Sequence, residues 1–175
     1  VDLSEADLRG ANLYQADLDS ATLRKASLTK ANLSQASLCS SELVGADFGS
    51  ADLQKAYLPL ADLRGAHLRS ANLRAASLEE TKLIDVNLQQ ADLEQASLHR
   101  ADASGARFQE ANLLGAYLRE TVLASANLKA ARVAAEQLAS AKSLAGATLP
   151  DGTKLSEENW EAEFEEWRER QEEQS

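Results

Sequence analysis

Residues 6–25 read ADLRG ANLYQ ADLDS ATLRK, four units of five residues in which alanine stands first and leucine third. This register runs from Leu3 to Leu138 without insertion or deletion, and leucine occupies 24 of the 28 positions. The other four are Phe48, Ala103, Phe108 and Val133. Two residues before each of these positions lies a second column, which is alanine at 22 of 28 places. A regularity of this length indicates one repetitive domain.

A period of five fits neither a straight helix nor a straight strand. On an α-helix the leucines would spread around the whole circumference, and on a strand they would alternate between the two faces. The chain must therefore bend once in every unit, after a short extended piece that points alanine and leucine the same way. Four bends close a square coil of 20 residues, stacked at the strand spacing of about 4.8 Å. The pattern thus predicts an all-β solenoid, a right-handed quadrilateral β-helix of about seven four-sided coils with leucine and alanine inside.

The alanine column is interrupted by hydroxyl residues at intervals of 40 residues. These are Ser41, Thr81 and Thr121, which alternate with alanine in the intervening coils. Since the inward site is tight, we expect each hydroxyl to bond to the backbone, which makes this feature one of packing.

The unit A-[D/N]-L-x-x resembles the pattern of the pentapeptide-repeat family. Residues 6–10, 11–13 and 91–93 match it as they stand, and the register covers residues 1 to about 138 of 175. The resemblance implies a non-catalytic scaffold that mediates protein–protein interaction, because hardly any members are thought to be enzymes. Fold alone does not identify the partner or the biological role.

The charge balance narrows the classes of partner. The chain has 28 acidic and 18 basic residues, for a net charge of −10. Nonspecific binding to nucleic acid or to an anionic membrane needs a basic surface, so we expect neither. No stretch approaches the roughly 18 apolar residues of a membrane span. The single cysteine, Cys39, is typical of a reducing compartment, so we expect a cytoplasmic protein, with a targeting leader removed before Val1 as the alternative.

The repeat gives way to different sequence after residue 138. We divide the chain into a β-helix over residues 1–138, a closing segment and turn over 139–155, and an amphipathic helix over 156–175. A short helix is expected over residues 134–141, after which leucine returns one place out of register at Leu144 and Leu149. The closing segment resembles the one found after many pentapeptide arrays. A solenoid needs such an end because its last coil exposes apolar side chains and unpaired strand edges.

The terminal helix carries an aromatic stripe, and we expect it to begin at an N-cap at Ser156 and run to about residue 171. Trp160, Phe164 and Trp167 follow one another at i, i+4 and i+7, which places them on one helix face. One interpretation is an α-helical cap packed on the last coil. The other is a contact with a partner or a homodimer, since tryptophan and phenylalanine are favoured interface anchors. A homodimer could also use an open solenoid end.

The outward positions offer no constellation for catalysis, and we expect no catalytic, cofactor-binding or metal-ligating residues and no cofactor. His67 and His99 fall on different sides of the square, and Cys39 lies three coils from His99. Two columns are more orderly. One places Tyr57 and Tyr117 in line, with Pro59 and Leu60 nearby as exposed apolar groups. The other repeats Asn or Asp every 20 residues and predicts a ladder of hydrogen bonds along the rod: Asn12, Asn32, Asp52, Asn72, Asp92 and Asn112.

A second function class is mimicry of duplex DNA. Quinolone-resistance members of the family resemble DNA in width, rise and acidity, and they bind DNA gyrase or a related topoisomerase. The net charge of −10 agrees with this hypothesis. Basic residues on the sides of the square, and the lack of any insertion that could form a projecting loop, argue against it.

Overall fold

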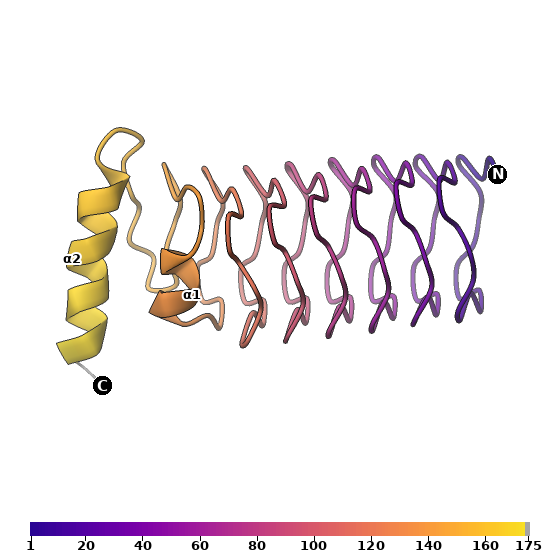
Figure 1. Ribbon diagram of the computed structural model, residues 1–175. Coiled ribbons are helices and arrows are strands. Elements are labelled where there is room, and N and C mark those ends of the chain that lie inside the picture. The colour runs from indigo at the N-terminus through magenta and orange to yellow at the C-terminus, as the bar shows by residue number, and fades with distance from the viewer. Residues whose placement is uncertain (174–175) are drawn as a thin grey trace.

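The computed structural model describes residues 1–173, and its main body is a stack of four-sided coils (Figure 1). Successive coils are joined by parallel bridges between residues 20 apart, from Asp2 with Thr22 to Asn112 with Arg132. Within residues 1–173 each of these bridges is isolated, and no strand of several residues forms. We number the sides of a coil by residue, each recurring every 20 residues: 1–5 is the first side, 6–10 the second, 11–15 the third and 16–20 the fourth.

Each corner of the square is a four-residue turn. In the second unit the N–H of Ala11 donates to the carbonyl of Leu8 at 3.0 Å, and the same bond recurs along the stack. Between residues 5 and 130, the residue before each position of the alanine column has a positive φ, as the third residue of a type II turn requires. From residue 5 to residue 130, 21 of these left-handed positions are not glycine. Backbone bonds between coils therefore hold many residues in a conformation that side chains disfavour.

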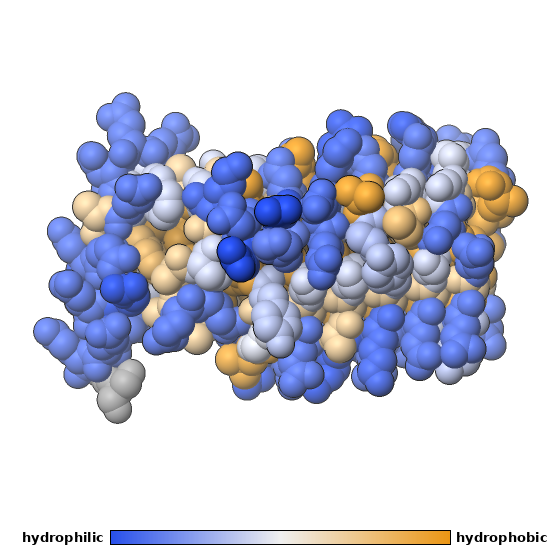
Figure 2. Space-filling model, in the orientation of Figure 1, coloured by the Kyte–Doolittle hydropathy of each residue, from blue (hydrophilic) through white to orange (hydrophobic). Residues whose placement is uncertain are grey.

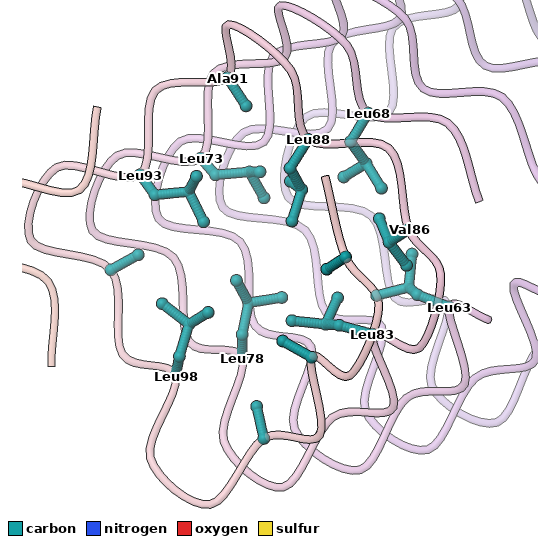
Figure 3. Close-up of a cluster of buried hydrophobic side chains, with 14 of the residues drawn as sticks. Leu63, Leu68, Leu73, Leu78, Leu83, Val86, Leu88, Ala91, Leu93 and Leu98 are labelled. Atoms are coloured by element: carbon teal, nitrogen blue, oxygen red, sulfur yellow. The ribbon is translucent and has the colours of Figure 1, made fainter. Parts of the chain in front are cut away.

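Leucine and alanine fill the interior, as the period predicts. Leu28, Leu73 and Leu93 are each 0% exposed. Figure 3 shows leucines one coil apart lying side by side, for example Leu73 beside Leu93. Such stacking gives each side chain equivalent neighbours above and below.

The three hydroxyl residues of the alanine column are buried and bonded to backbone carbonyls. Ser41 donates to Leu38 of its own turn at 2.6 Å. Thr81 donates to the carbonyl of Leu58, 23 residues earlier in the chain, at 2.9 Å. Thr121 donates to Leu98 in the same way at 2.7 Å. The expected backbone partners are thus confirmed.

The last coil is modified by a short helix, α1, over Ala135–Ala139. The Gln137 side chain donates to the carbonyls of Leu113 and Ala116, each at 2.8 Å, and so replaces backbone pairing at that edge. After α1 the parallel bridges join residues 21 apart, as in Val122 with Ser143, which is the shift of one place that the sequence predicts.

A second helix, α2, spans Trp160–Glu173 and lies across the end of the stack in Figure 1. It begins four residues later than we expected from Ser156. The reason is that the chain before it pairs with the closing segment, since Gly146 donates to the carbonyl of Ser156 and Leu155 donates to that of Ala147. Ser156 still caps the following bend, because its hydroxyl accepts the N–H of Asn159 at 3.0 Å.

Candidate interaction surfaces

The aromatic stripe of α2 faces the end of the β-helix, but its three residues are not equally covered. Phe164 and Trp167 are each 3% exposed and belong to the same buried cluster as the core leucines. Their rings stack with centroids 5.6 Å apart. Trp160 packs against that cluster and is only partly buried. The stripe therefore has a buried end and an accessible end.

A hydrogen bond joins the buried end of the stripe to the turn that precedes α2. Trp167 Nε1 donates to Asp151 Oδ2 at 2.9 Å, and the N–H of Thr153 donates to Asp151 Oδ1 at 2.9 Å. Partial burial raises the pKa of Asp151, but the hydrogen bonds from Thr153 and Trp167 outweigh it, so this pKa lies below its ordinary value. The ionised carboxylate is thus the form that the docked helix favours.

A groove of about 340 Å³, whose lining is apolar and polar in similar measure, lies between α1 and α2, beside Trp160. Figure 2 shows pale orange atoms between the hydrophilic outer surface of α2 and the end of the β-helix. Glu161 and Glu165 lie at the α2 wall. The apolar lining comes from both helices and from Ala141, just after α1. These residues are Leu138, Ala139, Ala141, Trp160 and Phe164.

The groove could not be anticipated from the sequence. Its α1 wall depends on where the short helix turns away from the coil register, and its α2 wall on the direction in which α2 crosses the end of the stack. The only sequence signal is the loss of the alanine column at Glu136, which marks the change of structure and not its shape.

A second apolar surface lies on the fourth side of the square. Tyr57, Leu60 and Tyr117 are 52%, 55% and 65% exposed. Pro59 is buried, so the expectation that it would be exposed with Leu60 is wrong. Asp19, Glu79 and Arg119 are exposed at the same turn position, so the burial belongs to Pro59, whose short ring does not extend outward as their side chains do. The exposed residue of this turn is Leu60, at φ +61°.

The fourth side is also acidic through residue 120. It carries Asp17, Asp19, Glu79, Glu80 and Glu120 against Arg100 and Arg119. None of these seven residues forms an ion pair within the described chain, residues 1–173. On the other sides, ion pairs neutralise several carboxylates. The Arg9 side chain, for example, bonds to Asp7 and lowers the pKa of that carboxyl to about 2.

The Asn and Asp column of the third side forms pairs and not a continuous ladder. Asn72 donates to Asp52 at 3.0 Å and Asn112 donates to Asp92 at 2.9 Å. The oxygens that accept these bonds also accept the backbone N–H two residues later, as Asp92 does from Glu94. The column is therefore occupied by local bonds that support the turns.

The described residues offer little for metal binding or membrane insertion. No group of three or more His, Cys, Asp or Glu side chains within residues 1–173 is arranged to hold a metal ion. His99 Nδ1 lies 3.0 Å from the carbonyl oxygen of Arg119, and Cys39 Sγ lies 3.7 Å from the Ser40 hydroxyl. Neither helix of the described chain has the length and apolar composition that a membrane span requires.

A family model described as pentapeptide repeats matches the chain in eight copies, over residues 2–38, 41–79, 61–100, 76–113 and 104–133. No curated protein matches this chain. Among solved structures, HetL is a pentapeptide repeat protein involved in heterocyst differentiation regulation from the cyanobacterium Nostoc sp. strain PCC 7120. It is 32% identical over 87% of this chain and 78% of HetL, with a TM-score of 0.43.

Two structures of QnrB1, a plasmid-mediated fluoroquinolone resistance protein, are similar in fold. A trypsin-treated variant is 22% identical over 83% of this chain and 70% of that one, with a TM-score of 0.65. The full-length form is 17% identical over 93% and 96% of the two chains, with a TM-score of 0.52. The family match and these neighbours imply that the stack of coils is a right-handed quadrilateral β-helix.

Proposed function

Because this chain belongs to the pentapeptide repeat family, we propose that it is a non-catalytic scaffold that binds another protein, and that the end bearing α2 takes part in the contact. The observation that supports this proposal is the partly buried Trp160 beside the groove between α1 and α2, next to aromatic side chains that are already covered. Tryptophan anchors beside apolar grooves are favoured positions for protein contacts.

The proposal assigns a role to each part of the chain. Residues 1–138 form about seven coils that act as a rigid rod, and residues 139–155 close it. The segment from residue 156, which includes α2, caps the last coil through Phe164 and Trp167 and presents Trp160 to the partner. A rod with a modified end suits a scaffold because repeats contact only their neighbours and leave long surfaces free.

Capture followed by reconstitution tests this function. The chain is immobilised, proteins retained from a lysate of its source cells are identified, and each is purified and titrated against the chain by calorimetry. We expect at least one purified protein to bind with defined stoichiometry. If no purified protein binds, the scaffold proposal is wrong.

The second candidate is a DNA mimic that binds DNA gyrase or a related topoisomerase. It is favoured by the unpaired acidic residues of the fourth side and by the fold shared with QnrB1. The ion pairs on the other sides, such as Arg74 with Glu94 at 2.6 Å, weigh against a uniformly acidic rod. Inhibition of gyrase supercoiling by the purified chain would support mimicry, and unchanged supercoiling at saturating chain would eliminate it.

A further inference from the structure

The groove between α1 and α2 is large enough to hold one or two apolar side chains of a partner. Its volume of about 340 Å³ lies at the lower end of the range for ligand pockets, about 300–1,000 Å³. Leu138 and Phe164 form covered walls, while Trp160 and Ala139 are accessible. An apolar side chain placed between them would lose its hydration without displacing any part of the fold.

The negative charge around the groove favours a partner segment with basic residues next to that apolar side chain. α2 contains seven glutamates and two arginines. Glu161, on the groove wall, forms no ion pair within residues 1–173, whereas Glu165 bonds to Arg168 at 2.6 Å. A segment that places Lys or Arg beside its apolar residue would meet an unpaired carboxylate there.

We propose that this groove binds a basic segment of another protein, with an apolar anchor side chain between Trp160 and Ala139 and a Lys or Arg on Glu161. This inference rests on the proposed scaffold function and specifies the partner's chemistry. Apolar burial supplies most of the affinity, and the charges supply the association rate and the selectivity.

A second copy of this chain is a poorer occupant of the groove. A two-fold contact uses the same surface on both subunits, so α2 would face α2. The glutamates that line the groove, Glu161 and Glu165, would then lie close to those of the other copy, on a helix that has seven glutamates and only two arginines. Like charges opposed across an interface disfavour that partner.

Fluorescently labelled peptides of equal length test the inference. The first carries a central Leu-Phe pair flanked by lysines, the second has glutamate in place of the lysines, and the third keeps the lysines but has serine in place of the pair. Anisotropy measures binding to the full chain, and sedimentation reports whether the chain is a monomer. We expect the first peptide alone to bind, more weakly as ionic strength rises.

Three variants locate the site. Ala139→Trp fills the groove from an exposed position and should weaken binding roughly tenfold or more, the loss of one good apolar contact. Glu161→Lys should weaken it about three- to fivefold. Glu166→Lys makes the same change of charge on α2 at an exposed residue outside the groove and should have little effect. Circular dichroism verifies that all three remain folded.

Four results would overturn the inference: binding that Ala139→Trp leaves unchanged, equal binding of the glutamate peptide, equal losses from Glu161→Lys and Glu166→Lys, or a native dimer that Ala139→Trp dissociates. These results are separable from a failure of the scaffold function. If the lysine peptide does not bind and purified partners bind Ala139→Trp as well as the unaltered chain, the groove inference is wrong and the scaffold proposal stands.

Discussion

Two adjacent alanines allow the same substitution to be made in opposite structural settings. Ala75 is an exposed corner residue at φ +55°, whereas Ala76 is the next residue, 1% exposed in the inward column. We expect Ala75→Gly to stabilise the fold and Ala76→Gly to destabilise it. Because the two sites are neighbours in one coil, differences in expression, charge and location along the rod are matched.

The magnitudes follow from two backbone terms and one packing term. At Ala75 the left-handed conformation costs a non-glycine residue about 1–2 kcal/mol, and the greater freedom of glycine in the unfolded chain offsets about 0.5–1 kcal/mol of that gain. The net stabilisation is therefore about 0.5 kcal/mol. At Ala76 the entropy loss of about 0.5–1 kcal/mol adds to a buried methyl worth about 0.8 kcal/mol. The net destabilisation is about 1.5 kcal/mol.

Thermal unfolding followed by circular dichroism measures both variants. For a chain of this size about 2–4 °C accompanies each kcal/mol, so Ala75→Gly should raise Tm by about 1–2 °C and Ala76→Gly should lower it by about 3–6 °C. Gly65→Ala is the reciprocal control, because Gly65 lies at φ +64° and an added Cβ would contact nothing within 4 Å. It should lower Tm slightly. A decrease in Tm for Ala75→Gly as large as that for Ala76→Gly would refute the reasoning.

Three further predictions concern buried polar groups and the helical end. Thr81→Val should cost about 0.5–1.5 kcal/mol in urea unfolding, because the Leu58 carbonyl loses the hydrogen bond from the Thr81 hydroxyl but keeps the one from the N–H of Ala61, and Thr81→Ser should restore most of this. The lowered pKa of Asp151 stabilises the fold at pH above that residue's ordinary pKa, and this contribution is lost as pH falls through the lowered value. Acid should therefore change the fluorescence of Trp167, and this change should be smaller in Asp151→Asn. An unchanged titration in Asp151→Asn would contradict this. Deleting residues 156–175 should lower stability by roughly 3–6 kcal/mol, because the burial of Phe164 and of Trp167 against the last coil, about 1.5–3 kcal/mol each, is lost with the segment. Unchanged Tm and a monodisperse product in sedimentation would eliminate the cap role.

The interior could be predicted from the sequence because it depends on one period repeated without interruption. A residue of the leucine column away from the ends of the rod has a coil on either side, so the burial of Leu73 follows from its place in the register, whereas Leu3, Leu8 and Leu13 in the first coil are only partly buried. The hydroxyl partners of Thr81 and Thr121 could be anticipated for the same reason, since a tight apolar site leaves only backbone carbonyls within reach.

The ends of elements and the surfaces could not be predicted to the same degree. The start of α2 depends on pairing between Leu155 and Ala147, residues that no short pattern connects. Pro59 is buried although Asp19, Glu79 and Arg119, which occupy the same turn position in other coils, are exposed. The groove beside Trp160 is a product of two helix directions, and these are set by tertiary packing that the repeat does not encode.

Hydrogen bonds between coils join residues about 20 apart at every level of the rod. Contacts at short sequence separation of this kind let ordering begin at any coil and spread to the next without closing a long loop. The free energy of unfolding of the rod is then a sum of contributions from single coils and from contacts between adjacent coils. A defect such as Leu73→Ala should loosen the coils on either side of it while distant coils keep their protection from hydrogen exchange, so the rod would open in segments and not as a whole.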